Sequence, residues 1–150
     1  MMEIKKTTDK DIDALMEIRL EMLRIVNNLK ENENFSNDLI EYSREYFLNG
    51  AQTTVFAMDG KQIAGCATLS YITIMPTFSH PTGKRAHLMN VYTRAQFRRQ
   101  GVGKMMVQFL IDEAKNRGVT EISLDATEMG HPLYKSLGFK DNAEGMILSI

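Results

Sequence analysis

The side chains best suited to chemistry gather in one short run, RRQGVGKMM, at positions 98–106. Two arginines precede two glycines that are separated by one residue, and a lysine follows directly. Glycine lets the backbone approach a ligand closely, and the first N–H groups of a helix attract an anion together with the helix dipole. Arg94, Arg98, Arg99 and Lys104 add charge-assisted hydrogen bonds, enough to hold a diphosphate. The run therefore predicts an anion site at the start of a helix.

Two common glycine-loop motifs fit this run poorly. A P-loop requires a glycine five residues before the Gly-Lys pair and a hydroxyl after it, but Arg98 and Met105 occupy those positions. A dinucleotide fingerprint requires a third glycine where this chain has Met106. A helix start with a solvated basic face explains the same residues without any ligand. The flanking elements have to decide between these interpretations.

The elements before the glycine run follow from apolar periodicity. Apolar residues recur at helical spacing in two segments before residue 50, and from residue 52 the period changes to two, as in strands. Asp59-Gly60 separates two alternating segments, which is typical of a tight hairpin turn. The sequence thus predicts a strand at 2–6, a helix capped at Thr8 or Asp9 that runs to Val26, a helix over 35–46, and antiparallel strands at 52–58 and 62–74.

A β-α-β unit follows and contains the glycine run. The segment 75–84 holds two of the three prolines and predicts a loop. A right-handed crossover sets the strands at 86–93 and 121–126 parallel, with the helix between them on one face. The elements predicted after the loop are a strand at 85–93, helices at 101–118 and 130–138 on either side of a strand at 121–126, and one or two strands after Phe139. The expected fold class is α/β with a mixed sheet, in the order β-α-α-β-β-β-α-β-α-β(β), as one domain over residues 1–150.

The composition argues against several other classes of protein. The 18 lysine and arginine residues nearly balance 19 acidic residues, so no overall field favours binding to nucleic acid or to a membrane. The single cysteine, Cys66, permits no internal disulfide, and no Cys/His cluster has zinc spacing, so we expect a reducing compartment and no metal. The N-terminus has charges every few residues and no long apolar run, which predicts neither a signal peptide nor a membrane span. We therefore expect a cytoplasmic protein.

The pattern Arg98-x-x-Gly101-x-Gly103 after a strand ending in LMNVYT resembles the acyl-CoA pyrophosphate loop of the GNAT superfamily of N-acetyltransferases. A second block, ATEMGHPLYKSLGF at 126–139, is similar to a later segment of that family. The element order matches over essentially the whole chain, whereas the motifs cover 86–139 only. The resemblance implies a sheet whose strands at 86–93 and 121–126 splay apart, with acetyl-CoA bound as a cosubstrate between them.

The resemblance also implies which residues bind acetyl-CoA. The bulged backbone of Val91, Tyr92 and Thr93 would bind the pantetheine arm, and the Val91 N–H would polarise the thioester carbonyl as in an oxyanion hole. The pyrophosphate would be held by charge and by main-chain N–H groups, from Arg98, Arg99, Gln100, Gly101, Val102, Gly103 and Lys104.

The acid and the base of acetyl transfer follow from the same resemblance. Tyr134 falls where the family places the tyrosine that protonates or hydrogen-bonds the departing sulfur. His87 falls where many relatives have a glutamate base, and Glu128 and then Asp125 are the other candidates. A core tyrosine, a strand-face histidine and a helix N-terminal carboxylate would explain these residues structurally, and attack through an ordered water without a dedicated base stays open. Thr127 replaces an asparagine that often contacts the cofactor, so we expect an altered contact there.

The expected activity is acetyl-CoA-dependent acetylation of a primary amine by direct attack in a ternary complex. The acceptor would lie across the sheet from the cofactor, against the two N-terminal helices and the loop at 75–85. Charges of both signs in that region name neither a small-molecule amine nor a protein amine. A catalytically silent acyl-CoA-binding sensor, or a nucleotide-binding protein, would use the same anion site. The resemblance also allows a homodimer, because strands near the C-terminus of such folds often pair between subunits.

Overall fold

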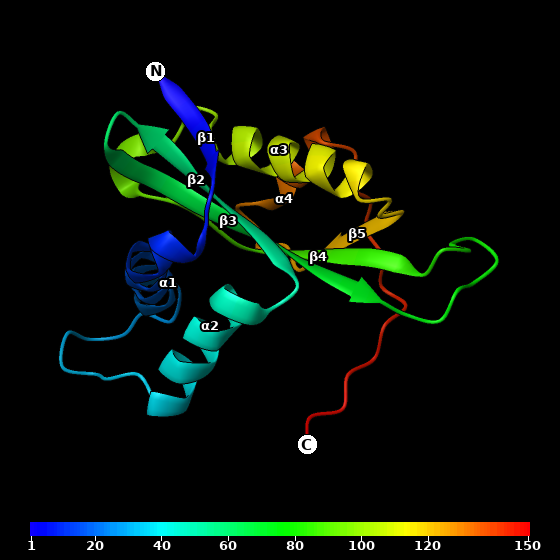
Figure 1. The fold of residues 1–150 in the computed structure, drawn as a ribbon, viewed down its shortest axis with the longest axis horizontal. Coiled ribbons are helices and arrows are strands. Elements are labelled where there is room, and N and C mark those ends of the chain that lie inside the picture. The colour runs from blue at the N-terminus through cyan, green and yellow to red at the C-terminus, as the bar shows by residue number, and fades with distance from the viewer.

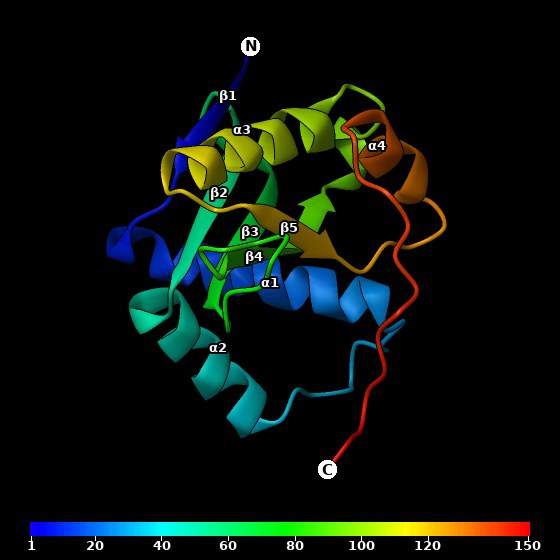
Figure 2. The same ribbon diagram turned by 90° about the vertical axis from the view of Figure 1, so that its right-hand side faces the viewer.

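A mixed five-stranded sheet lies between two layers of helices in the computed structural model, which describes all 150 residues (Figures 1 and 2). Helices α1 and α2 cover one face, and α3 and α4 cover the other (Figure 2). The strands follow the order β1-β2-β3-β4-β5 across the sheet and comprise β1 Met2–Lys6, β2 Gln52–Asp59, β3 Gln62–Thr73, β4 Lys84–Thr93 and β5 Glu121–Leu124. The helices are α1 Ile12–Val26, α2 Asn37–Asn49, α3 Val102–Asn116 and α4 His131–Ser136, with 3-10 turns η1 Asp9–Asp11 and η2 Ala95–Phe97.

The predicted strand pairings are confirmed. Strands β1 to β4 are antiparallel, and β2 and β3 turn at Gly60, whose φ is +61°. After β4 the chain crosses through α3 and returns as β5, which pairs with β4 in parallel. The mixed α/β fold expected from the sequence is therefore present.

The sheet separates two apolar cores because successive strand residues point to opposite faces. On β2, Val55 packs into the core beneath α3, whereas its neighbour Phe56 packs with α1 and α2. Helix α3 contributes Met106 and Leu110 to the first core, and both are fully buried. This packing on both faces anchors the middle strands and the end of β4, from which the chain enters η2 and then the glycine run.

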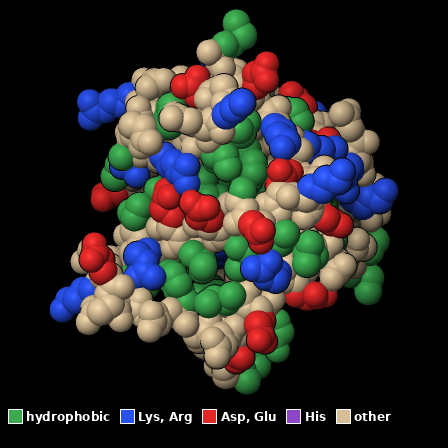
Figure 3. All heavy atoms as spheres, turned by 60° about the vertical axis from the view of Figure 1, so that its left-hand side comes forward, with side chains coloured by type: hydrophobic (Ala, Val, Ile, Leu, Met, Phe, Trp, Pro, Cys, Tyr) green, Lys and Arg blue, Asp and Glu red, His purple; other side chains and the backbone are tan.

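The face of the molecule in Figure 3 has no field of one sign. Lys and Arg side chains are interspersed with Asp and Glu side chains over the face in Figure 3, and apolar side chains gather in the hollows between them. No helix combines the length and the continuous apolar character needed to cross a membrane.

The strands predicted after Phe139 are wrong. Residues 139–150 form no strand and run as a tail past the sheet to the C-terminus (Figures 1 and 2). Asp141 accounts for this path, because its carboxylate lies 2.7 Å from His131 Nε2 and 3.1 Å from Lys135 Nζ, which ties the chain to α4. The tail carries apolar residues near its end, but no neighbouring strand pairs with it, and β5 remains the edge of the sheet. The strand predicted at 121–126 also ends earlier, at Leu124.

Candidate active site

Strand β4 contains a bulge at the point where it leaves β5. Met89 pairs with Thr68 and Tyr92 with Cys66, so Asn90 and Val91 together oppose a single residue of β3. Asn90 has a φ of +59°, a conformation that asparagine tolerates better than most residues and that is typical of some bulges.

Pairing of β4 with β5 ends at Leu88, two residues before Asn90 of the bulge. The parallel register runs from Arg85–Glu121 to Leu88–Leu124 and stops there. Beyond Leu88, β4 therefore has no partner on the β5 side, and Val91 lies where the two strands have parted. The splayed arrangement expected from the resemblance is present.

The turn into α3 exposes backbone donors. Arg99 and Gly101 both have positive φ, +63° and +75°, and α3 starts at Val102. The first helical hydrogen bond runs from the Met105 N–H to the Gly101 carbonyl at 3.0 Å. The N–H groups of residues 102–104 precede that bond and face outward from the start of the helix. A Cβ built on Gly101 would meet no atom within 4 Å, so the turn is open to a ligand.

Three of the four predicted cations remain near this turn. Arg98 donates from Nε to the Thr93 carbonyl at 3.1 Å, which ties the turn to the end of β4. The side chains of Arg99 and Lys104 are exposed and form no ion pair in the protein. A diphosphate at this turn would therefore meet cations that no carboxylate already neutralises.

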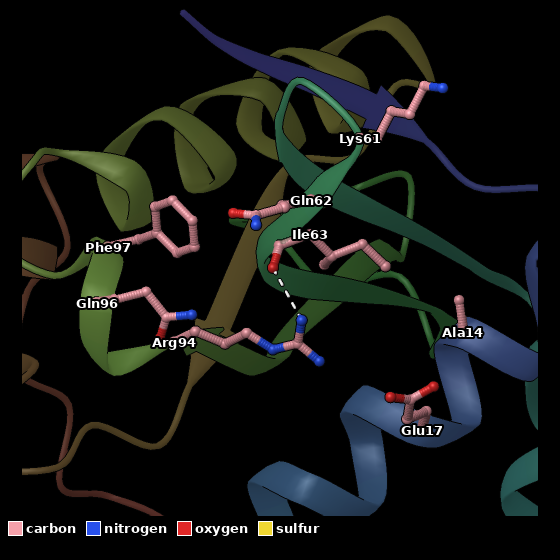
Figure 4. A pocket seen from close by; sticks show the side chains of 8 residues that line it. All are labelled: Ala14, Glu17, Lys61, Gln62, Ile63, Arg94, Gln96 and Phe97. Atoms are coloured by element: carbon pink, nitrogen blue, oxygen red, sulfur yellow. Dashed lines mark hydrogen bonds between the residues drawn. The ribbon is translucent and has the colours of Figure 1, made fainter.

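Arg94 is not part of this anion site, which corrects the sequence-based prediction. Its Nη2 lies 3.0 Å from Glu21 Oε1 on α1, and its Nη1 donates to the Ile63 carbonyl at 3.1 Å. Figure 4 shows the Arg94 side chain crossing a cavity of about 290 Å³ toward α1. The side chain points away from the α3 turn because Glu21 is its partner, and sequence spacing alone could not reveal a contact between residues so far apart.

Glu21 also receives a hydrogen bond from the Tyr92 hydroxyl at 2.7 Å. Burial acts to raise the pKa of Glu21, but the hydrogen bonds from Arg94 and Tyr92 and the charge of Arg94 lower it on balance. Burial and the same hydrogen bond raise the pKa of Tyr92 to about 12. This cluster fixes the end of β4 to α1, so the Tyr92 side chain has a structural role and only its backbone faces the parted strands.

Tyr134 lies on α4 with its ring edge against Phe139, at 5.8 Å between ring centroids. Burial raises the pKa of Tyr134, and no hydrogen bond contributes to the shift, so the hydroxyl is protonated at neutral pH and has no partner in the protein. The side chain lines a cavity of about 800 Å³ that follows β5 and α4. The tyrosine can therefore donate a hydrogen bond to a group that enters this cavity.

The two candidate bases differ in position. His87 lines the same cavity as Tyr134, with Nδ1 2.8 Å from Ser123 Oγ and Nε2 3.7 Å from Asp125 Oδ2. Glu128 is exposed in the turn before α4, lies outside the lining of that cavity and forms no ion pair. His87 on β4 and Tyr134 on α4 thus line one cavity, and Glu128 lies outside it.

Thr127 stabilises the turn between β5 and α4. Its Oγ1 accepts a hydrogen bond from the Gly130 N–H at 3.2 Å, and its carbonyl accepts from the His131 N–H at 3.0 Å. The side chain is exposed and its hydroxyl proton remains available. No group of three or more His, Cys, Asp or Glu side chains is arranged to hold a metal ion.

A separate cavity of about 510 Å³ lies on the other face, between α1, α2, β3 and β4. Arg19 and Asn90 both line it, and Arg19 Nη1 donates to Asn90 Oδ1 at 3.0 Å. Sequence analysis missed both roles. Asparagine in a strand that precedes a glycine turn is a weak signal of a bulge, whereas nothing in the spacing of α1 distinguishes Arg19 from other surface arginines.

Comparison with known proteins gives concordant matches. The model of the acetyltransferase (GNAT) family matches residues 12–139. A predicted acetyltransferase from Clostridium acetobutylicum, whose crystal structure is described as containing acetyl-CoA, superposes with a TM-score of 0.85 at 32% identity and covers 99% of this chain and 96% of its own.

Curated relatives match over shorter stretches. Glucosamine 6-phosphate N-acetyltransferase of Trypanosoma brucei brucei is 28% identical over 89 residues, which is 59% of this chain and 58% of that protein. An uncharacterized N-acetyltransferase of Bacillus subtilis is 29% identical over 99 residues, or 62% of this chain and 60% of that protein. The matched region thus spans somewhat over half the length of each of these two relatives.

Proposed function

This chain belongs to the acetyltransferase (GNAT) family, and on that premise we propose that it moves an acetyl group from acetyl-CoA to a primary amine by direct attack in a ternary complex. The observation that carries the proposal is the combination of the bulge at Asn90 and Val91 with the open α3 turn. The bulge presents strand backbone beside a gap, and the turn presents helix N–H groups next to it. A ligand with a polar arm and a diphosphate needs both.

Acetyl-CoA fits this arrangement and would supply the activated acetyl thioester. The N–H groups from Gln100 to Lys104 would bind the pyrophosphate, with Arg98, Arg99 and Lys104 adding charge. The backbone of residues 91–93 would bind the pantetheine arm by strand-like hydrogen bonds. Thr127, exposed beside α4, would donate one further hydrogen bond to the cofactor.

The Val91 N–H is the proposed donor to the thioester carbonyl. Ladder hydrogen bonding is disrupted at a bulge, and β4 has no β5 partner at this residue. A main-chain donor held in a rigid strand stabilises the oxyanion of the tetrahedral intermediate without reorganising.

Tyr134 is the proposed acid for the departing sulfur. A thiol has a pKa of about 8.5, so the leaving group needs only modest help from a donor. The raised pKa of Tyr134 keeps its hydroxyl protonated, so that it can stabilise the departing sulfur by donating a hydrogen bond as charge develops there. Without another partner, the hydroxyl can turn to the sulfur as the C–S bond breaks.

A base must act on the amine before attack. A lysine-like amine at neutral pH loses its proton at a cost of about 4–5 kcal/mol. We assign this role to His87, directly or through a water, because it lines the cavity of Tyr134 and its ring is oriented by Ser123 and Asp125. Glu128 is the second candidate and lies outside that cavity.

The acceptor in this proposal is an amine on a small molecule or on a protein. Relatives are named for both kinds of acceptor: glucosamine 6-phosphate, and an alanine of ribosomal protein bS18 in Salmonella typhimurium. A homodimer also belongs to the proposal. It is supported by the apolar tail, where Met146, Ile147 and Leu148 are 98%, 95% and 85% exposed, and by the edge of β5, with which no further strand of this chain pairs.

Calorimetric titration with acetyl-CoA, followed by thiol release over a panel of amines, tests the proposal. We expect binding that Arg99→Ala weakens in a salt-dependent way, while Arg44→Ala on α2, across the sheet, changes nothing. Binding without thiol release for any amine would favour the silent sensor. Protection against unfolding by ATP but not by CoA would refute the proposal in favour of a nucleotide site.

A further inference from the structure

The cavity on the α1 and α2 face has the size of a small-molecule site. Its volume of about 510 Å³ lies within the usual range for ligand pockets. Met89 and Asn90, the two residues before Val91 on β4, form part of its wall. The cavity therefore reaches the bulge from the face opposite α3 and places its contents next to the proposed thioester site.

Arg19 is the only charged residue in the lining of this cavity. Its guanidinium donates one hydrogen bond, to Asn90 Oδ1, and no carboxylate oxygen lies within 4.0 Å of it. Burial lowers the pKa of Arg19, yet a guanidinium keeps its charge in proteins. The partly buried guanidinium of Arg19 thus has one neutral amide as its hydrogen-bond partner in the protein, and its other partners must be molecules that enter the cavity.

The neighbouring arginines are satisfied differently. Arg24, also on α1, donates to the carbonyls of Lys30 and Glu33 at 2.9 Å each, and Arg94 is paired with Glu21. The amide of Asn90 is in turn held by Thr68, because Nδ2 donates to Thr68 Oγ1 at 3.2 Å. Arg19 is therefore positioned on the cavity wall, and its remaining N–H donors are left for a ligand.

The rest of the cavity is mainly apolar and aromatic. Tyr42, Ile72 and Met89 are 73%, 44% and 41% exposed, which leaves apolar surface at the cavity for a ligand to cover. No aspartate or glutamate lines it. A polycation would meet the charge of Arg19 without a compensating carboxylate, whereas an anionic group would form a charge-assisted and often bidentate pair.

We propose that the acceptor is a small primary amine that bears a carboxylate or a phosphate and an apolar body, with the anionic group bound by Arg19. This inference rests on the proposed acetyl transfer and names the class of acceptor for it. Because Arg19 contacts Asn90 and Val91 follows Asn90, the anion and the amine would lie about 5–10 Å apart, a few bonds in a small molecule.

Matched pairs of amines test the inference on the full chain. Phenylalanine is compared with phenylalanine amide, and glucosamine 6-phosphate with glucosamine, so that each pair differs in its anionic group and the two pairs separate carboxylate from phosphate. Spermidine and a peptide with a free N-terminal alanine serve as cationic and protein-like acceptors. We measure kcat/KM with saturating acetyl-CoA and, independently, binding of each amine to the CoA-loaded protein by calorimetry.

We expect the anionic member of at least one pair to be preferred by about tenfold or more, in rate or in binding. Arg19→Gln should remove that preference and leave the affinity for acetyl-CoA unchanged, since Arg19 lies across the sheet from the α3 turn. Arg19→Glu should favour the amide. Arg44→Gln, which removes an exposed cation of α2 outside the cavity lining, should retain the preference.

Other outcomes overturn the inference. Equal use of both members in both pairs, use of spermidine or the peptide as well as the best anionic amine, or a preference that survives Arg19→Gln would show that Arg19 does not select the acceptor while leaving acetyl transfer intact. Failure of every amine to bind the CoA-loaded protein would overturn it as well. Failure of acetyl-CoA itself to bind would instead refute the proposed function.

Discussion

Replacing Gly101 with alanine tests whether the α3 turn binds a diphosphate through its backbone. Gly101 has a φ of +75°, and a Cβ there would meet no atom of the protein within 4 Å. The substitution should cost about 1–2 kcal/mol of the free energy of unfolding through backbone strain alone. For a chain of this size Tm should fall by about 2–8 °C. The new methyl would also occupy the open space before the helix, so we expect the affinity for CoA to fall by about 10- to 100-fold.

Two matched variants separate strain from binding. Gly118, just after the other end of α3, has a φ of +77°, and a Cβ there would lie 3.8 Å from Lys84 Nζ. Gly118→Ala should therefore lose similar stability and keep its affinity for CoA. Gly103→Ala, in the first turn of α3, places a Cβ 3.4 Å from Leu133 Cδ2 on α4, an ordinary contact between the helices, so the free energy of unfolding should be unchanged or higher by up to about 1 kcal/mol.

Thermal unfolding of all three variants gives their stability, and calorimetric titration with CoA gives their affinity for the cofactor. Equal CoA affinity in Gly101→Ala and Gly118→Ala would refute the assignment of the turn as a diphosphate site, whatever their stabilities. A large loss of affinity in both would mean that strain in α3, and not blocked approach, weakens binding.

Three further measurements follow from other contacts. Tyr134→Phe should lower kcat by about tenfold or more with little change in stability, since no hydrogen bond shifts its pKa; an unchanged kcat would contradict its role as the acid. Glu21→Gln should lower the free energy of unfolding by about 1 kcal/mol at neutral pH, a value reduced for a carboxylate that is 34% exposed. Burial acts to raise the pKa of Glu21, but the hydrogen bonds from Arg94 and Tyr92 lower it on balance. The stabilisation by Glu21 is therefore complete above the ordinary carboxyl pKa and is lost as the pH falls through the lowered pKa. The free energies of unfolding of the unsubstituted protein and of Glu21→Gln, measured in urea, should therefore become equal in acid. A difference that stays constant with pH would argue that ionised Glu21 is not the source of the stabilisation. Sedimentation should show a dimer for the full chain and a monomer after deletion of residues 146–150; a monomer in both cases would exclude the tail as an interface.

The fold could be predicted from the sequence wherever an element pairs or packs with another element that is close to it in the chain. The Asp59-Gly60 turn sets the β2–β3 hairpin within a few residues, and the β-α-β crossover has one favoured hand. The prediction of strands after Phe139 is wrong for the opposite reason. One or two strands are predicted after Phe139, but a strand has to pair with a sheet edge, and the contacts of Asp141 with α4 direct the chain elsewhere.

The candidate site likewise has features that adjacent residues predict and features that only distant contacts determine. The backbone donors of the α3 turn follow from two glycines and a helix start, which are adjacent in sequence. The partner of Arg94 is Glu21 on α1, and the partner of Arg19 is Asn90 on β4, each about 70 residues away in the chain. Charge counting treated Arg94 as available and gave Arg19 no role, because only the packing of α1 against β4 decides which arginine is neutralised.

Asn90 links the two halves of the proposed reaction. Its φ of +59° creates the bulge beyond the last β4–β5 pair, and its side-chain oxygen accepts the hydrogen bond from Arg19 on the other face. Glycine would adopt this backbone conformation with less strain but would offer no oxygen to Arg19, whereas most other side chains would resist the conformation. In the proposed reaction, one residue would thus determine both where the Val91 N–H meets a thioester and where Arg19 meets an anion. The spacing between the proposed donor and acceptor sites would therefore be built into the backbone of β4 and would not depend on two loops moving together.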